Sequence, residues 1–249
     1  MNKLFAGVAA IATLLTVPAY AADMPVKAPP PPPVPVWSWT GLYIGLEGGA
    51  GWADTQQTDT AGTTSGPYHQ SGGLFGGTIG YNRQINNVVL GAEADMSWAG
   101  IDGSVILPGL CTAGGGTVCF TNMHWLNTDR VRLGVAFGNN GVSWMPYITG
   151  GLAGAEIQSG QLSCSTPIPG AIASCGTHDE WAGVVGGGVE AMFARNWSAK
   201  IEYLHTDFGT HTFYTVVIPV NARESNVNIV RVGLNYHFNW GGPTPMWTK

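Results

Sequence analysis

The feature that most constrains the fold is a two-residue alternation, which is clearest in the stretch 227–238. This stretch reads V-N-I-V-R-V-G-L-N-Y-H-F. One face carries Val230, Val232, Leu234, Tyr236 and Phe238, and the other carries Arg231, Gly233, Asn235 and His237. Because successive side chains of a strand point to opposite faces, the stretch predicts a strand between an apolar and a polar environment. A soluble sheet can show the same pattern, so recurrence along the chain has to decide between the two.

The alternation recurs in seven earlier segments. They cover about 39–52, 73–84, 88–98, 125–137, 147–157, 181–193 and 197–206, although the glycine-rich segment 147–157 does not reveal its faces. Short turn signals lie at 86–87, 138–141 and 195–196. Long connections cover about 53–72, 100–122, 158–179 and 207–225. Short turns that alternate with long loops are typical of outer-membrane barrels.

We therefore predict an all-β fold, namely a closed antiparallel eight-stranded up-and-down transmembrane β-barrel. A strand of about 12 residues, tilted by about 45°, covers roughly 28 Å, which is close to the apolar band of such barrels. Closure leaves no open sheet edge in lipid. The alternative is a secreted soluble sandwich.

Composition favours the membrane reading. Charged residues make up only 10% of the chain, against about 25% in soluble domains. Six tryptophans near segment ends predict interfacial girdles: Trp39, Trp52, Trp98, Trp125, Trp181 and Trp197. The net charge of −5 offers no basic patch, so nucleic acid is not an expected partner.

The N-terminus predicts export. A basic Lys3, an apolar run 4–17 and an A-x-A site at 19–21 indicate a signal peptide over 1–21, cleaved after Ala21. The run is too short for a membrane anchor. Residues 22–36 are proline-rich and predict an extended periplasmic linker, either a spacer or a partner-binding segment. The barrel domain then covers 37–249, with a short C-terminal tail.

Nine charged residues fall on predicted inward faces. They are Glu47, Glu93, Asp95, Arg130, Arg132, Glu190, Lys200, Glu202 and Arg231. Lys or Arg on the lipid face would cost about 2–4 kcal/mol at the midplane, so these charges have to point inward. The interior of an eight-stranded barrel is just wide enough to be filled by side chains, so we expect the charges to pair and close the lumen. The alternative is the constriction of a small porin with modest passive conductance.

The four cysteines form two close pairs, Cys111 with Cys119 and Cys164 with Cys175. Each pair lies within one predicted loop, so in an oxidising compartment we expect two local disulfides. Crossed pairing remains open. A metal site is the weaker alternative, because the pairs lack C-x-x-C spacing and a clustered histidine.

Other candidate ligands and catalytic groups are scattered, so we predict no enzyme, no cofactor and no metal site. Haem or another surface ligand would need loop residues such as Tyr68, His69, His178, His211 and Tyr214, which lie in three predicted loops without diagnostic spacing. The run 178–180 places a histidine beside two acids, but sequence neighbours on a loop rarely form a catalytic site, and no nucleophile elbow is present.

Several motifs carry a family resemblance. Residues 39–45, W-T-G-L-Y-I-G, closely resemble the W-T-G-x-Y-x-G opening of small outer-membrane proteins of the RopB type, often called outer-membrane immunogenic or porin-like proteins. Residues 125–134, with R-V-R-L-G, look like the central R-x-R-x-G strand of that family, and residues 196–203 look like its seventh strand. The resemblance covers about 37–242.

The resemblance implies an OmpA-like eight-stranded barrel in the cell outer membrane of a Gram-negative bacterium, with a role in membrane integrity and surface properties. It implies lipid, lipopolysaccharide and the barrel-assembly machinery as partners, and a monomer or weak homo-oligomer. The final strand resembles the signal that this machinery reads, with Arg231, Gly233, Tyr236 and Phe238 in its four places, although the chain continues to Lys249. Some relatives are reported to bind haem, a property that would need matching ligands in this chain.

Overall fold

The structure is a computed structural model that describes residues 38–105, 119–139, 141–161, 174–214 and 219–238. All of them belong to the second of two units into which the chain divides, Pro35–Lys249. The predicted signal peptide, the linker and the tail after Phe238 lie outside the described residues. In the described ranges no helix is long and apolar enough to cross a membrane.

The described chain forms ten strands of one antiparallel sheet. They are β1 (Gly41–Asp59), β2 (Thr64–Ile85), β3 (Val88–Val105), β4 (Cys119–Val135), β5 (Phe137–Asn139), β6 (Val142–Gln161), β7 (Ser174–Ala194), β8 (Trp197–Thr206), β9 (Gly209–Tyr214) and β10 (Pro219–Phe238).

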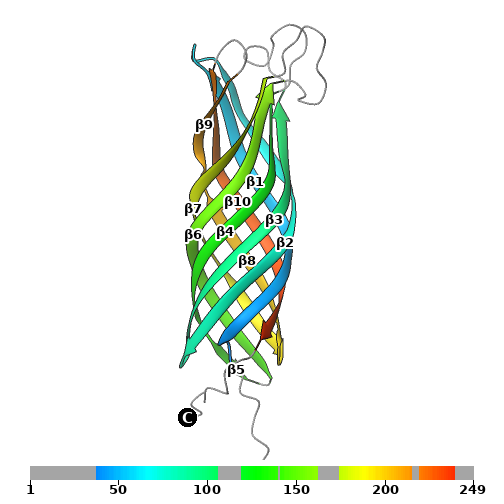
Figure 1. Cartoon of the computed structure of the whole chain (residues 1–249), viewed down its shortest axis with the longest axis vertical. Coiled ribbons are helices and arrows are strands. Elements are labelled where there is room, and N and C mark those ends of the chain that lie inside the picture. Colours follow the sequence, from blue (N-terminus) through cyan, green and yellow to red (C-terminus); the bar gives the residue numbers. More distant parts are fainter. Residues whose placement is uncertain (1–37, 106–118, 140, 162–173, 215–218, 239–249) are drawn as a thin grey trace, which may run out of the picture. The chain divides into compact units, whose positions relative to one another are not determined.

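The sheet closes into a ring, because β1 pairs with both β2 and β10 (Figure 1). The short β5 continues β4 alongside β6, and β9 continues β8 alongside β10. Counted with these continuations, the ten strands form the eight strands of the barrel wall. The predicted closed antiparallel eight-stranded barrel is therefore confirmed.

The two ends of the barrel differ. At the turn end, lower in Figure 1, the first and last strands meet with Leu42 opposite Phe238. The turn between β2 and β3 lies at this end, and Asn86 adopts a left-handed conformation there (φ 55°), which asparagine tolerates. The opposite end, where β1 joins β2 through residues 60–63, is called the loop end. In outer-membrane barrels the short turns face the periplasm and the longer loops face outward.

Most strands are longer than predicted. Only β8 matches its predicted range, 197–206; β2 has 22 residues and β6 has 20, against the expected 12 or so. The predicted loops 53–72, 100–122, 158–179 and 207–225 were too long, because strand structure occupies parts of each. The reason is physical: beyond the lipid both faces of a strand can be polar, so the apolar–polar alternation ends before the strand does.

An apolar band covers the outside of the barrel between aromatic side chains at its two edges. Toward the loop end these are Trp52, Trp98, Trp125 and Trp181, and toward the turn end they are Trp144 and Trp197, all exposed. The prediction was wrong for Trp39, which is fully buried and donates its indole N–H to Ser143 Oγ at 3.0 Å. Trp39 precedes β1 and packs into the barrel mouth, where the hydrogen bond satisfies its one polar atom.

The lumen is filled by four successive layers. From the turn end, the first is the basal apolar layer, which consists of Trp39, Val89, Ala136, Met145, Tyr147 and Met192. The second is the charge network, formed by the nine predicted inward charges. The third is the apolar septum, which consists of Leu74, Ile101, Met123, Leu126, Ile157, Leu204, Phe208, Val227 and Ile229, with several alanines. The fourth, toward the loop end, is the outer polar layer, which consists of Thr55, Gln57, Tyr68, Gln70, Thr121, Ser159, His211 and Glu224. Strand β10 shows the order directly, because its inward residues run from Arg231 through Ile229 and Val227 to Glu224.

Candidate functional site: the filled lumen

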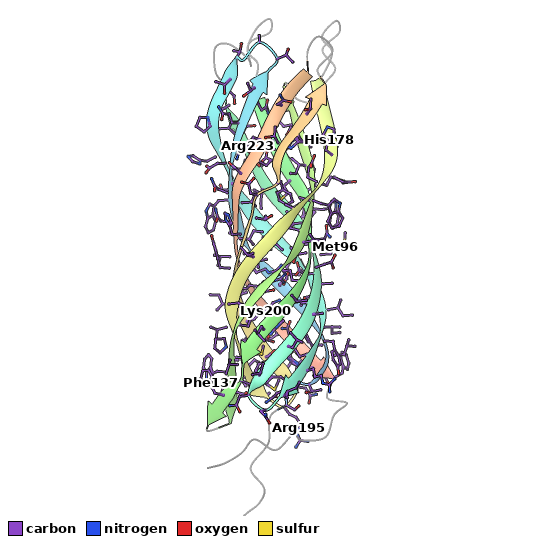
Figure 2. All side chains as sticks on the ribbon, turned by 90° about the vertical axis from the view of Figure 1, so that its left-hand side faces the viewer. Met96, Phe137, His178, Arg195, Lys200 and Arg223 are labelled. Atoms are coloured by element: carbon purple, nitrogen blue, oxygen red, sulfur yellow. The ribbon has the colours of Figure 1, made fainter. Side chains whose placement is uncertain are left out.

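The structure brings all nine predicted inward charges together inside the barrel. Each is at most 5% exposed. They come from β1, β3, β4, β7, β8 and β10, where the two-residue alternation turns them away from the apolar band. In Figure 2 Lys200, a member of the network, lies between Phe137 near the turn end and Arg223 near the loop end.

Arg231 is one centre of the network. Its guanidinium lies 2.5 Å from Glu47 Oε1 and 2.8 Å from Asp95 Oδ1. Its second terminal nitrogen lies 2.7 Å from Glu202 Oε2. One planar cation therefore neutralises carboxylates from β1, β3 and β8, a geometry that suits the rigid donor fork of arginine.

Arg130 and Arg132 connect the remaining acids. Arg130 lies 2.6 Å from Glu93 and 3.0 Å from Glu202. Arg132 lies 3.0 Å from Glu93 and also pairs with Glu190. Lys200 Nζ lies 2.9 Å from Glu93 and 3.3 Å from Glu47. Every acid of the network thus has at least one arginine or lysine partner, as a buried charge requires.

Tyrosine, serine and histidine side chains complete the network, although the predicted set of inward charges did not include them. Tyr43 donates its hydroxyl to Glu93 at 2.7 Å, and Tyr147 donates to Glu202 at 2.8 Å. Ser198 Oγ lies 2.7 Å from His237 Nε2. Residue parity places Tyr43 and His237 on inward faces, so their participation could have been found. Tyr147 could not, because its segment did not reveal its faces.

The outer polar layer was not predicted. Tyr68 is its centre: its hydroxyl accepts from Gln57 Nε2 at 3.0 Å and lies 2.8 Å from Thr121 Oγ1. Thr121 lies 3.2 Å from Ser159, which lies 3.5 Å from His211 Nε2. This chain of contacts crosses the lumen from β1 to β9.

Glu224 is the one acid in the outer polar layer. Its Oε2 accepts hydrogen bonds from Thr55 Oγ1 and Gln70 Nε2, each at 2.7 Å. Glu224 pairs across the sheet with Thr55, three residues beyond Trp52 toward the loop end, and therefore lies outside the apolar band. Burial raises the pKa of its carboxyl to about 7.

The predicted ligand candidates lie in strands rather than in loops, which corrects that expectation. Tyr68 and His69 are in β2, His178 is in β7, and His211 and Tyr214 are in β9. The structure brings His178 and His211 together, with ring centroids 6.0 Å apart. It places His69 on the outside, 2.5 Å from Asp54. Within the described ranges no three His, Cys, Asp or Glu residues form a group that could hold a metal ion.

The acid–histidine neighbours at 178–180 do not converge. Strand alternation turns His178 and Glu180 toward the lumen and leaves Asp179 exposed on the outer surface. The run is therefore split across two environments.

The predicted disulfides stay a prediction. Cys111 and Cys164 lie outside the described residues, while Cys119 lies in β4 and Cys175 in β7. No cysteine in the described part of the chain is free.

A closed antiparallel ring with an apolar outer band and a charged interior defines an integral outer-membrane β-barrel protein. The chain belongs to the family of the outer membrane protein beta-barrel domain, whose model matches residues 7–238. It is 34% identical over 242 residues to the 31 kDa outer-membrane immunogenic protein of Brucella melitensis, covering 92% of this chain and 98% of that protein.

Two further comparisons agree. The 22 kDa outer membrane protein of Rhizobium leguminosarum bv. viciae is 30% identical over 81% of this chain and 79% of its own length. The crystal structure of OprG from Pseudomonas aeruginosa aligns with a TM-score of 0.50 and 13% identity, over 81% of this chain and 98% of that one, and supports the fold alone. The protein is thus an outer-membrane protein that resides in the cell outer membrane.

Proposed function

We propose that this protein is a structural barrel, closed to solutes, that contributes to outer-membrane integrity and surface properties. The observation that supports this role is the filled lumen. The apolar septum and the basal apolar layer lie on either side of the charge network, and every side chain in these three layers is buried. An ion in transit would have to displace both the paired charges and an apolar layer that water does not wet. The proposal assigns no catalytic group and no cofactor.

Conductance in a planar bilayer tests this proposal against the small-porin alternative. The purified protein, shown to be folded by heat-modifiable migration, should give no stable monomer conductance. A reproducible conductance that Arg132→Ala or Glu93→Ala abolishes would overturn the closed barrel. Arg223→Ala, which changes an exposed residue on the outer face, is the matched control and should leave the recording unchanged.

We also propose that the final strand is read as an assembly signal, with the outer-membrane lipid and lipopolysaccharide as later partners of a monomer or weak homo-oligomer. Phe238 ends β10 and packs edge-to-face on Tyr236, with ring centroids 5.1 Å apart. Gly233 leaves room for the Lys200 side chain, since a Cβ at this position would lie 2.9 Å from Lys200 Cε.

The assembly proposal predicts unequal effects of two aromatic substitutions. Phe238→Ala should impair membrane insertion far more than Phe137→Ala, although both remove an aromatic near the turn end. The fraction of heat-modifiable protein in outer-membrane preparations measures the effect. Equal fractions for the two variants would mean that the segment is merely a strand.

We further propose export from a Gram-negative cell through the cleaved signal peptide 1–21, and local disulfides at Cys111–Cys119 and Cys164–Cys175. N-terminal sequencing of the mature protein should begin at Ala22. Non-reducing peptide mapping should recover the two local links. Free thiols in the mature protein would contradict the disulfides, and crossed peptides would replace the proposed pairing.

A further inference from the structure

Three buried acceptor atoms in the outer polar layer have no hydrogen-bond partner. They are Glu224 Oε1, Gln57 Oε1 and His211 Nδ1; a further such atom, His178 Nε2, belongs to a half-buried side chain of β7 that faces the same layer. The side chains of the first three are 1%, 0% and 6% exposed, respectively. Leaving a buried polar group without a hydrogen-bond partner is unfavourable, and native structures contain few such groups. Two such atoms of the charge network, Arg130 Nη1 and Glu47 Oε2, lie within 3.3 Å of an opposite charge. The three in the outer polar layer have no such partner among the described residues and therefore mark a place for a donor.

The strand register gathers the three residues around Ala222. Gln57 of β1 pairs with Ala222 on one side, and His211 of β9 pairs with it on the other. Glu224 stands two residues further along β10 and faces the same way. Neighbouring side chains on adjacent strands are about 5 Å apart. Ala222 contributes only a methyl group between these three longer side chains, and we call this place in the register the Ala222 notch.

Among the described residues, the notch has one acid and neither a lysine nor an arginine. Of the buried acids in the described part of the chain, all except Glu224 belong to the charge network. The titratable side chains that face Glu224's layer are Tyr68 from β2, His211 from β9 and His178 from β7, while Arg223 is exposed on the outer surface. Burial and the nearby His178 lower the pKa of His211 to about 4, so His211 is neutral near pH 7 and its Nδ1 can accept.

We propose that the Ala222 notch binds one small cation that carries N–H donors, an ammonium ion or a primary ammonium group, between Glu224, Gln57 and His211. An ammonium group offers at least three donors and one positive charge. The notch offers three acceptors and, once Glu224 ionises, one negative charge. Calcium and magnesium take about six or more oxygen ligands, so the acceptor set fits them poorly. The site lies on the loop-end side of the apolar septum and leaves the barrel closed.

Because the cation and a proton compete for Glu224, binding should depend on pH in a defined way. Burial keeps the Glu224 carboxyl protonated up to about pH 7. Affinity should therefore be constant well above pH 7 and fall about tenfold per pH unit below it, or roughly 100-fold at pH 5. Near pH 6 each bound cation should displace close to one proton into the buffer.

Calorimetric titration of methylammonium chloride into the refolded full-length protein at pH 8 and constant ionic strength tests the proposal. We expect one saturable site, the pH dependence above, and at least tenfold weaker binding of tetramethylammonium, which lacks N–H donors. Absence of a saturable heat at pH 8, or equal binding of sodium or tetramethylammonium, would overturn the proposal.

Variants locate the site. Glu224→Gln should abolish methylammonium binding, and Gln57→Leu should weaken it at least tenfold. Glu180→Gln changes a half-buried lumen glutamate in β7 outside the notch and should leave binding unchanged. Each variant is first checked for heat-modifiable migration, and Gln57→Leu decides the matter if Glu224→Gln does not fold. Wild-type affinity for methylammonium in a folded Glu224→Gln or Gln57→Leu barrel would show that the cation does not bind in the notch.

Discussion

The charge network and the outer polar layer lie on opposite sides of the apolar septum, and their buried acids have different partners. In the charge network every acid lies within ion-pair distance of an arginine or lysine. In the outer polar layer hydroxyls and amides surround a single acid, Glu224, that has no basic partner among the described residues. Within the apolar band, charges must be compensated inside the protein, because lipid offers no water. Beyond the band this requirement relaxes, and a group whose charge responds to pH or to a ligand can be kept.

The largest effect is expected from removing one cation of the charge network. Arg132→Met leaves Glu93 and Glu190 short of a cation, and we expect the free energy of unfolding to fall by about 3–5 kcal/mol. Urea titration of the protein in lipid vesicles, followed by heat-modifiable migration, measures the loss.

Arg223→Met is the matched control, because Arg223 is exposed on the outer face of β10 beyond the apolar band. Its effect should stay within about 0.5 kcal/mol. A comparable loss in both variants would show that the network pairs contribute no more than a surface charge.

The next largest effect is expected in the outer polar layer, where the stability of the barrel should depend on pH through Glu224. The folded protein holds the Glu224 proton up to about pH 7, whereas a glutamate with its ordinary pKa of 4.5 loses it earlier. Because only the unfolded state releases this proton as pH rises through this window, it is stabilised relative to the folded state. The free energy of unfolding should therefore fall by about 3 kcal/mol between pH 4.5 and 7. Unfolding titrations without ammonium ions across this range measure the slope.

Glu224→Gln removes the titrating group and should be close to wild type at pH 4 but more stable than wild type at pH 8. Glu180→Gln should keep the wild-type slope. If Glu224→Gln retains that slope, the pH dependence originates elsewhere and the contrast between the charge network and the outer polar layer loses its basis.

The members of the charge network could be predicted from the sequence because the lipid-facing side of each strand has to be apolar. Outward residues such as Val131 and Leu133 are apolar, so the intervening Arg130 and Arg132 had to face inward. Parity alone could also have added Tyr43. What it could not supply was the pairing itself, such as Arg231 reaching Asp95 on β3, because strand tilt and side-chain length decide which charges meet.

The outer polar layer was missed for the complementary reason. Around Thr55 and Gln57 the residues on the outer face, Asp54 and Gln56, are polar as well, so no alternation in polarity marks a strand. The predicted loop 207–225 was wrong for the same reason, because β9 and the start of β10 lie there. Trp39 shows a related limit, since an aromatic at a segment end fits both an interfacial girdle and a buried cap.

The smallest and most direct comparison deletes one hydroxyl from the charge network and one from the outer polar layer. Tyr43 donates to Glu93 and accepts from Arg132 Nη1 at 3.1 Å, so Tyr43→Phe removes hydrogen bonds to charged groups and should cost about 1.5–3 kcal/mol. Tyr68 contacts only the neutral Gln57 and Thr121 through its hydroxyl, so Tyr68→Phe should cost about 0.5–1.5 kcal/mol.

Urea titrations at one pH, run in parallel on the two variants, compare the hydroxyls without changing any formal charge. A larger loss for Tyr68→Phe would mean that the outer polar layer contributes more to the stability of the barrel than its neutral contacts suggest. Equal losses would mean that the charges in the network add nothing to the hydrogen bonds made with them. The expected order, Tyr43→Phe above Tyr68→Phe, follows because a hydrogen bond to an ionised partner in a water-free interior is stronger than one between neutral groups.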